Sequence, residues 1–356
     1  MEITNEYRNL TKDEEIVLGI ISELESREKD PKTNEITISE SLKITLTVEG
    51  IKKLKMISKK KVDSDSTINS LIAKTLIFND GSELKLTKIG FKVGKRIRSK
   101  QISDWYNDNL LRCAKSKAYG LFCEKVFGKN LYQFNVLDMD QLDTLISTLN
   151  LNSHDSVLDL GCGLGKVTEY IQVKTGAKIT GIDFAEQLIQ WAKTNTEADE
   201  DVLEFQVGNI NDLSFPSSSF TAIYAIDTLY PPNIDNLETT IAKLKEILEP
   251  NGQLGIFFAQ IIESKEHQHI LKPNQTKIAQ ALKNNDLSFT VVDFTRNARD
   301  IWEREISFGN ELREMFEKEK NLDLCEDRIA DGKNCIYRID NQLQKRYYYH
   351  VSKSVK

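Results

Sequence analysis

The residues best suited to chemistry lie in the segment VLDLGCGLGK, residues 157–166. Its apolar start predicts a buried strand, glycines stand at 161, 163 and 165, and a helix is predicted directly after them. Such a turn needs glycine because a ligand must approach the backbone more closely than a Cβ atom permits. Asp183 lies 22 residues after Gly161, at the end of the next predicted strand, KITGID. A carboxylate there can accept hydrogen bonds from both hydroxyls of a ribose.

The residues around this turn distinguish between two kinds of ligand. The fingerprint of dinucleotide-binding enzymes has Gly or Ala where this chain has Lys166, and it does not require an acid inside the strand. Here Asp159 stands two residues before the first glycine, and its carboxylate would repel a pyrophosphate. The same carboxylate would favour a ligand with a cationic amino-acid end. The pattern therefore predicts an adenosine ligand of that kind rather than NAD.

Four segments, VLDLGCGLG, GIDFAEQLIQWAK, VGNIND and FTAIYAIDTLY, resemble the first four motifs of class I S-adenosylmethionine-dependent methyltransferases. The resemblance covers about residues 125–353 and implies S-adenosyl-L-methionine as the cofactor. The cofactor contacts that it implies are Asp159, Gly161 and Gly163 for the methionine part, Asp183 for the ribose, and Phe184, Asn209 and Ile210 for the adenine.

Simpler roles stay open for some of these residues. Phe184 and Ile210 can be ordinary core residues, and Asp183 can cap the helix predicted over AEQLIQWAK while also binding the ribose. The family often has Asp where this chain has Asn209, although an amide oxygen can still accept a bond from the adenine amino group.

Two further segments resemble parts that close the site in this family. The run GKNLYQFN, residues 128–135, resembles the N-terminal lid of small-molecule amine methyltransferases, which implies cofactor contacts from Tyr132 and Gln133. A predicted helix containing Trp302 and Phe308 lies between the last two strands, where the family inserts a substrate cap. Core packing is the alternative for both aromatic residues.

The candidates for catalysis follow the fourth and fifth predicted strands. Asp227 and Tyr230 stand at the carboxyl edge, where open parallel sheets bind ligands, and the resemblance places such residues near the transferring methyl group. His267 offers a general base, although histidines without carboxylate or cysteine neighbours are more often surface residues. The order Tyr-Pro-Pro differs from the Asn/Asp-Pro-Pro-Tyr motif of nucleic-acid amino-methyltransferases, so DNA base methylation loses support. We predict no metal site.

Strands and helices alternate strictly from residue 155 onward, which predicts an α/β fold. The expected architecture is a Rossmann-like, seven-stranded, mostly parallel sheet with helices on both faces. The chain continues with a helix near 275–285, a strand LSFTVVDF, a long helix from about residue 300 to 320 and a last strand RYYYHVSK. We predict a methyltransferase domain at 151–356, preceded by a helical connector and lid at 101–150.

Residues 1–100 predict a small α+β domain that resembles the winged helix-turn-helix of bacterial repressors. The elements expected are a helix at 11–27 with a capping box, a strand at 35–39, helices at 48–61 and 66–75, a hairpin about Asn79-Asp80-Gly81, and a helix from about Lys88. In a DNA complex the 66–75 helix would offer Thr67, Asn69, Ser70 and Lys74 for contacts.

Charge and composition limit the remaining choices. The chain carries a net charge of −6, yet residues 51–100 hold 14 Lys/Arg against 4 Asp/Glu, a balance of +10. That block suggests an anionic partner, with a solvated lysine-rich helix as the alternative. No apolar run is long enough for a membrane span and no secretory signal is visible, so we expect a cytoplasmic location. The five cysteines form no CxxC pair, which argues against a disulfide framework.

Three functions compete on these observations. The leading prediction is methyl transfer from S-adenosyl-L-methionine to a small-molecule N or O acceptor. A neutral amine needs no strong base, whereas a hydroxyl needs Asp227, Tyr230 or His267 to assist proton loss. The alternative is a transcriptional regulator that binds duplex DNA and senses S-adenosylmethionine or a metabolite. In a third reading the winged helix is a dimerisation element of a homodimer.

Overall fold

The computed structural model describes residues 10–28, 64–81, 83–230 and 234–353. The chain divides into two compact units, residues 1–104 and residues 105–356. Each unit has a hydrophobic core of its own, and the two are described separately below.

The first unit contains α1 (Lys12–Glu28), α5 (Ser64–Ala73), the hairpin of β1 (Ile77–Asn79) and β2 (Leu84–Leu86), and the beginning of α6 (Lys88–Lys115). Apolar residues recur at helical spacing in α1 and α5 and form its core together with the hairpin. The predicted strand at 35–39 and helix at 48–61 lie outside the described residues. The winged-helix fold therefore stays a prediction.

A capping box begins α1, as predicted. The Glu14 backbone N–H donates to Thr11 Oγ1 at 3.2 Å, and the Thr11 N–H donates to Glu14 Oε2 at 2.7 Å. The buried Glu14 carboxylate also accepts hydrogen bonds from Ser70 Oγ of α5 at 2.7 Å and from Lys74 Nζ, directly after α5, at 2.6 Å. Two of the side chains that a DNA complex was expected to use are therefore engaged within the unit.

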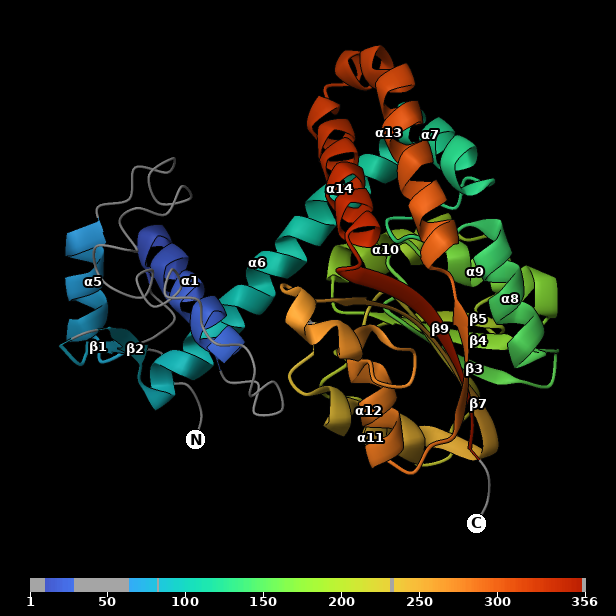
Figure 1. Ribbon diagram of the computed structural model, residues 1–356, viewed down its shortest axis with the longest axis horizontal. Coiled ribbons are helices and arrows are strands. Elements are labelled where there is room, and N and C mark those ends of the chain that lie inside the picture. Colours follow the sequence, from blue (N-terminus) through green and yellow to red (C-terminus); the bar gives the residue numbers. More distant parts are fainter. Residues whose placement is uncertain (1–9, 29–63, 82, 231–233, 354–356) are drawn as a thin grey trace. The chain divides into compact units, whose positions relative to one another are not determined.

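The second unit is built on a single sheet (Figure 1). Within the described residues the strand order is β5-β4-β3-β6-β7-β9-β8, and β9 runs antiparallel to both of its neighbours. This confirms the predicted α/β fold with a seven-stranded, mostly parallel sheet. The strands are β3 (Ser156–Leu160), β4 (Lys178–Asp183), β5 (Leu203–Val207), β6 (Phe220–Ile226), β7 (Leu248–Ile261), β8 (Phe289–Asp293) and β9 (Gln344–Ser352).

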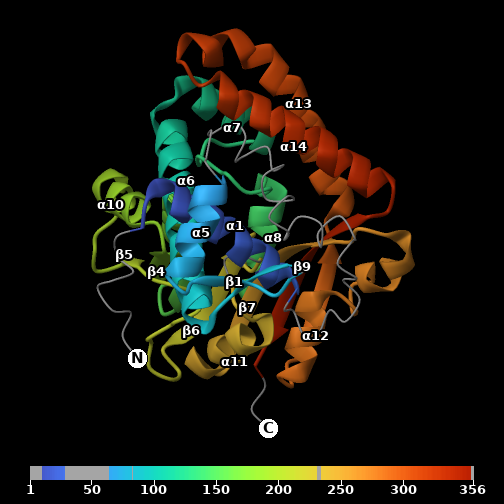
Figure 2. The ribbon, with the colours of Figure 1, turned by 90° about the vertical axis from the view of Figure 1, so that its left-hand side faces the viewer.

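Helices cover both faces of this sheet (Figures 1 and 2). On one face α8 (Met139–Leu149), α9 (Lys166–Thr175) and α10 (Glu186–Asn195) bury their apolar sides against the strands. On the other face α11 (Leu237–Ile247) and α12 (Lys277–Asn284) do the same. Alternate strand residues face opposite sides, so the five inner strands contribute to both cores, whereas the edge strands β5 and β8 each contribute to one.

A helical cap is inserted between β8 and β9. It consists of α13 (Thr295–Lys318) and α14 (Leu322–Asp340), which pack with α7 (Lys117–Phe127). The sequence predicted only the first of the two inserted helices. Gly332 lowers the intrinsic helix propensity of α14, but a Cβ atom there would lie 3.0 Å from Ile306 Cγ1 of α13. Close packing of the two helices thus overrides a weak local signal.

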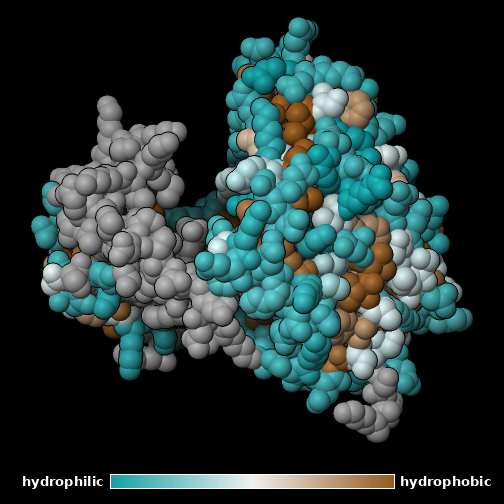
Figure 3. All heavy atoms as spheres, viewed as in Figure 1, coloured by the Kyte–Doolittle hydropathy of each residue, from teal (hydrophilic) through white to brown (hydrophobic). Residues whose placement is uncertain are grey.

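In the space-filling view, hydrophilic residues dominate the outward face of the second unit, and hydrophobic residues show in smaller patches (Figure 3). Of the helices described, none is both long enough and apolar enough to cross a membrane.

Candidate functional site

The glycine turn after β3 is held by backbone hydrogen bonds from the neighbouring strand. The N–H groups of Gly161 and Cys162 both donate to the Ile182 carbonyl, at 2.8 and 3.0 Å. Gly161 has φ +81°, and a Cβ atom there would lie 2.0 Å from Thr228 Cγ2 at the end of β6. Gly163 also has a positive φ, of +52°. The turn therefore requires glycine for its conformation and for its close approach to β6.

Asp183 ends β4 directly beside this turn. Its Oδ2 accepts from the Gly163 N–H at 3.0 Å, and its Oδ1 accepts from the Ala185 N–H at 2.9 Å. Burial raises the pKa of this carboxyl group, and the backbone hydrogen bonds oppose the rise. Helix α10 has Ala185 at its N-cap without a side-chain bond, so Asp183 does not cap that helix. Each carboxylate oxygen keeps capacity for a further hydrogen bond, as a ribose would require.

Asp159 lies inside β3 and faces the helix that follows the turn. Its side chain is almost fully buried, and Oδ2 accepts a hydrogen bond from Thr168 Oγ1 of α9 at 2.7 Å. Burial raises the pKa of Asp159 to about 7, against the opposing hydrogen bonds from Thr168 and Tyr224. The carboxyl group thus ties the strand to the helix, and its charge changes near neutral pH.

Residues 105–115 of α6, here called the covering helix, pack over the glycine turn. Leu110 forms a small apolar cluster with Leu164 of the turn and with the start of α10. A Cβ atom on Gly163 would lie 3.5 Å from Leu110 Cδ2. The Tyr106 ring meets the half-buried Phe184 ring edge-on, with centroids 5.9 Å apart. Phe184 therefore lies between the end of β4 and the covering helix.

Residues 130–137, here called the lid loop, pack beside the covering helix. Tyr132 adopts φ +50°, and its ring meets the Trp191 ring edge-on with centroids 6.2 Å apart. Gln133 is buried, its Oε1 accepts from the Leu131 N–H at 2.9 Å, and its carbonyl accepts from the Tyr119 hydroxyl at 2.7 Å. Its Nε2 has no partner within the described residues. A buried free donor fits a cofactor whose end carries a carboxylate.

The two adenine candidates differ in their availability. Ile210 is partly buried against the core beside α11. Asn209 is exposed, and its Oδ1 already accepts hydrogen bonds from the Asn211 N–H and Nδ2, at 2.9 and 3.1 Å. Contact with an adenine amino group would require the Asn209 side chain to leave Asn211.

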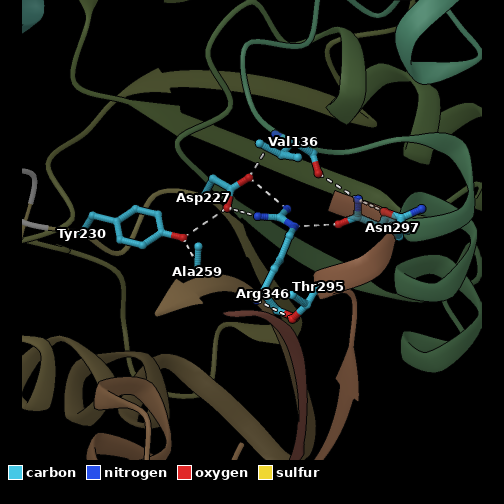
Figure 4. A network of polar contacts seen from close by, with 8 residues as sticks. Val136, Asp227, Tyr230, Ala259, Thr295, Asn297 and Arg346 are labelled. Carbon is cyan, nitrogen blue, oxygen red and sulfur yellow. Dashed lines mark hydrogen bonds and ion pairs between the residues drawn. The ribbon is translucent and has the colours of Figure 1, made fainter. Parts of the chain in front are cut away.

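Asp227 follows β6 with φ +54° and is paired with Arg346 of β9 (Figure 4). The guanidinium binds both carboxylate oxygens, with Nη1–Oδ1 at 2.5 Å and Nη2–Oδ2 at 2.9 Å. The Val136 N–H of the lid loop donates to Oδ2 at 3.2 Å, and the Tyr230 hydroxyl donates to Oδ1 at 3.2 Å. The Asp227 charge is therefore compensated by a buried arginine.

Tyr230 is fixed from two sides. Its hydroxyl accepts a hydrogen bond from the Ala259 N–H at 2.5 Å, and its ring stacks on Phe258 with centroids 4.8 Å apart. Burial, and secondarily the charge of Asp227, raise the pKa of the phenol well above its ordinary value. Tyr230 consequently stays protonated across the neutral range.

Arg346 is a site residue that the sequence did not reveal. It stands in a strand otherwise rich in tyrosine, and its only signal was a charged residue within that apolar run. Its Nε donates to Gln141 Oε1 at 2.9 Å, and Gln141 Nε2 donates to the Val136 carbonyl at 2.8 Å and to Asn297 Oδ1 at 2.7 Å (Figure 4). One arginine therefore connects the sheet edge, the lid loop and the cap.

The remaining candidates lie on the elements after β7. His267 lies half-buried in the 3-10 helix η2 (Lys265–Leu271), where its backbone N–H donates to the Ser264 carbonyl at 3.1 Å. Trp302 is buried in the cap, with its ring centroid 5.4 Å from the Arg328 guanidinium. Phe308 is partly buried in the same cap and lies under the Lys125 ammonium.

A buried ion pair joins the cap to the lid loop. Arg328 Nη2 binds Glu305 Oε1 at 2.5 Å, and both side chains are buried. The same guanidinium donates weakly to the Phe134 carbonyl at 3.4 Å and lies 5.4 Å from the Phe134 ring centroid. The lid loop is thus anchored both to the cap and to the Asp227–Arg346 pair.

Comparison with known proteins places this geometry in a class. Residues 157–252 match a family model described as a methyltransferase domain. The chain is 29% identical over 133 residues to the phosphoethanolamine N-methyltransferase of Plasmodium falciparum, covering 37% of this chain and 49% of that one. It is 35% identical over 104 residues to the sterol 24-C-methyltransferase ERG6B of Gibberella zeae, covering 28% and 27%.

A solved structure supports the fold. The phosphoethanolamine N-methyltransferase 2 of Haemonchus contortus, in complex with phosphomonomethylethanolamine and S-adenosylhomocysteine, superposes with a TM-score of 0.51. It is 16% identical in sequence, and the match covers 70% of this chain and 60% of that one.

The glycine turn, the strand order and the matched family define one class. Residues 157–252 match a methyltransferase domain, and the second unit has the seven-stranded, mostly parallel sheet of the Rossmann-like methyltransferase fold. The match to the two curated relatives spans half of their length or less.

Proposed function

We propose that the chain transfers a methyl group from S-adenosyl-L-methionine to the nitrogen of a small-molecule amine. When bound, the cofactor supplies a methyl group on a sulfonium, so that a new N–C bond forms as the S–C bond breaks and its electron pair stays on sulfur. The residues proposed to hold it are Asp159, Gly161, Gly163, Asp183, Phe184, Asn209, Ile210, Tyr132 and Gln133.

The Asp227–Arg346 pair is the observation that favours an amine nitrogen over a hydroxyl oxygen as the methyl acceptor. Both oxygens of the Asp227 carboxylate are bound by a buried guanidinium, so neither is free to face the acceptor without breaking part of that ion pair. Tyr230 holds its own proton. A hydroxyl acceptor needs a base at this edge, whereas a neutral amine attacks with its own lone pair. Asp227 and Tyr230 are then positioning residues, and His267 is left as the candidate base.

Asn135 supports an amine in this place. Its Oδ1 is buried and has no partner within the described residues, and the next residue, Val136, binds Asp227. A free carbonyl oxygen can accept an N–H from an amine and so orient its lone pair. The amine methyltransferases among the matched proteins favour the same acceptor class.

The test uses the full chain, methyl-labelled S-adenosylmethionine and paired probes. Phosphoethanolamine and ethanolamine offer a nitrogen, and ethylene glycol and glycerol offer only oxygen. We expect label on nitrogen, and kcat/KM that rises about tenfold per pH unit below the pKa of the amine, since only the neutral amine reacts. Label on oxygen, or a rate that follows an enzyme base instead, would refute the amine proposal.

The comparisons give the DNA-binding alternative no support, because the proteins reported above are methyltransferases. A winged-helix role in DNA binding or in a homodimer stays a prediction for residues 1–100. The cytoplasmic location stays a prediction as well.

A further inference from the structure

We propose that Asn107 of the covering helix accepts a hydrogen bond from the α-ammonium group of the cofactor. None of the sequence motifs assigns a cofactor contact to this helix. The inference rests on S-adenosylmethionine as the cofactor, and it holds whichever acceptor is methylated.

Asn107 is a buried amide with an unsatisfied oxygen. The residue is 6% exposed, and its Oδ1 has no hydrogen-bond partner within the described residues. Asn109, on the same helix, is 7% exposed, yet its Nδ2 donates to the Trp105 carbonyl at 2.8 Å. Buried polar atoms in native proteins nearly always have a partner, and an orphaned one calls for a ligand or a bound water. Asn109 has no buried side-chain atom without a partner among the described residues, so burial of the residue alone does not explain the unpaired oxygen of Asn107.

The covering helix places Asn107 beside the glycine turn. Residues three apart share one face of a helix, so Asn107 lies on the same face as Leu110. Leu110 Cδ2 is 3.5 Å from the position of a Cβ atom on Gly163, and Leu110 packs on Leu164. The glycine turn is the part of the fold proposed to hold the methionine end of the cofactor. Asn107 is consequently one helical turn away from that end.

The lid loop supplies the complementary group. The Phe134 ring meets the rings of Trp105 and Tyr106 with centroids 5.8 and 6.5 Å apart, which places the loop against the helix. Gln133 Nε2, next to Phe134, is a buried donor without a partner within the described residues. An unpaired acceptor on one segment and an unpaired donor on the other match the ammonium and the carboxylate of an amino-acid zwitterion.

The state of the Asp159 carboxyl group is compatible with a second partner for the ammonium group. One of its oxygens is engaged by Thr168, and burial raises its pKa to about 7, so it is only partly charged at neutral pH. A neutral amide oxygen can bind an ammonium group without that dependence on pH.

Calorimetry with two ligands tests the contact in the full chain. S-adenosylhomocysteine carries the amino-acid end, and 5′-methylthioadenosine has the same adenosine thioether without it. We expect Asn107→Leu to weaken S-adenosylhomocysteine at least tenfold and to leave 5′-methylthioadenosine unchanged. Asn107→Asp, which keeps the shape and adds charge to the acceptor, should bind S-adenosylhomocysteine as tightly as the wild type or more tightly.

Asn109→Ala is the matched control, because it removes a buried amide from the same helix without removing an unpaired oxygen. It should change neither affinity by more than about twofold. An Asn107→Leu variant that binds both ligands normally, or loses both equally, would overturn the assignment; in the second case the side chain serves the adenosine part or the fold. If the wild-type chain binds neither ligand, the cofactor assignment is wrong, and the proposed Asn107 contact is wrong with it.

Discussion

The residues proposed to hold the cofactor, here called the cofactor half, and those proposed to lie beside the acceptor, the acceptor half, differ in how far apart in the sequence their hydrogen-bond partners lie. In the cofactor half, Asp183 is fixed by Gly163, 20 residues away, and Asp159 by Thr168, 9 residues away. In the acceptor half, Asp227 is fixed by Arg346, 119 residues away, and by Val136, 91 residues away. The two carboxylates of the cofactor half are fixed within the consecutive elements β3, the glycine turn, α9 and β4, whereas the acceptor half exists only once the whole sheet has formed.

The difference in sequence distance also affects how much a single substitution destabilises each half. Groups held by backbone N–H donors of their own segment keep their partners when distant residues change. A buried ion pair between remote strands depends on both members, because removal of one leaves a buried charge. The acceptor half should therefore be the more sensitive of the two to single substitutions.

The largest effect is expected at Arg346. Arg346→Met removes the cation and leaves Asp227 with uncompensated charge, which should lower the free energy of unfolding by about 3–5 kcal/mol. Denaturant unfolding of the full chain measures this. The double variant Arg346→Met/Asp227→Leu should recover part of the loss, and an Arg346→Met variant as stable as the wild type would contradict the comparison.

A pH-dependent effect is expected at Asp159. Its pKa is raised from 3.8 to about 7 in the folded chain. The native state therefore binds a proton that the unfolded chain releases, and the stabilisation is complete below about pH 4 and lost as pH rises through about 7. Asp159→Asn should remove this loss of stability, so at pH 8 the free energy of unfolding of the variant should exceed that of the wild type by up to roughly 4 kcal/mol. Unfolding measured at pH 5 and pH 8 tests the sign: a variant whose advantage over the wild type does not grow with pH disagrees with it.

Asp183 tests the cofactor half directly. Asp183→Ala should weaken S-adenosylhomocysteine by roughly 1.5–3 kcal/mol, the range for losing hydrogen bonds to a charged group. Calorimetry gives the affinity, and the exposed Asp201→Ala serves as the surface control. Unchanged affinity would take the ribose role away from Asp183.

The smallest effect is expected at Tyr230. Tyr230→Phe leaves the Ala259 N–H without its acceptor and Asp227 without one donor, a loss of about 1 kcal/mol in unfolding free energy. The pH profile of methyl transfer should keep its shape between pH 6 and 9, because the phenol stays protonated there. Disappearance of a basic limb in the variant would instead make Tyr230 a proton acceptor.

The same contrast explains what the sequence could predict. The strands 156–160 and 178–183 were predicted to the residue, because a short apolar strand, a glycine turn and a helix follow one another without interruption. Spacing cannot connect Asp227 with Arg346, since nothing local distinguishes that arginine from a surface residue of an edge strand. The second cap helix was missed for a related reason, because its Gly332 is explained only by a partner helix.

The lid loop gives a second example of what a sequence motif cannot predict. Tyr132 and Gln133 were singled out by resemblance, which implied no contact for Asn135 at the end of the same run, and no motif included Asn107. What distinguishes those two is an unpaired oxygen in a buried setting, which is a property of packing. The residue types tell which donors and acceptors are present, but only the folded structure shows which of them already have hydrogen-bond partners.

The cap enters and leaves the sheet at one point. The Phe294 N–H donates to the Arg346 carbonyl at 2.9 Å, and the Arg346 N–H donates to Thr295 Oγ1 at 3.0 Å, so the two ends of the inserted hairpin are joined. The pairing of β8 with β9 and these two hydrogen bonds involve only the ends of the insertion, so they do not set the length of the cap. Because the joint includes the arginine that holds Asp227, each exchange of the cap would also retune the edge where the acceptor is methylated. The cofactor half would be affected as well, but only through the lid loop, because Arg328 of the cap contacts Phe134.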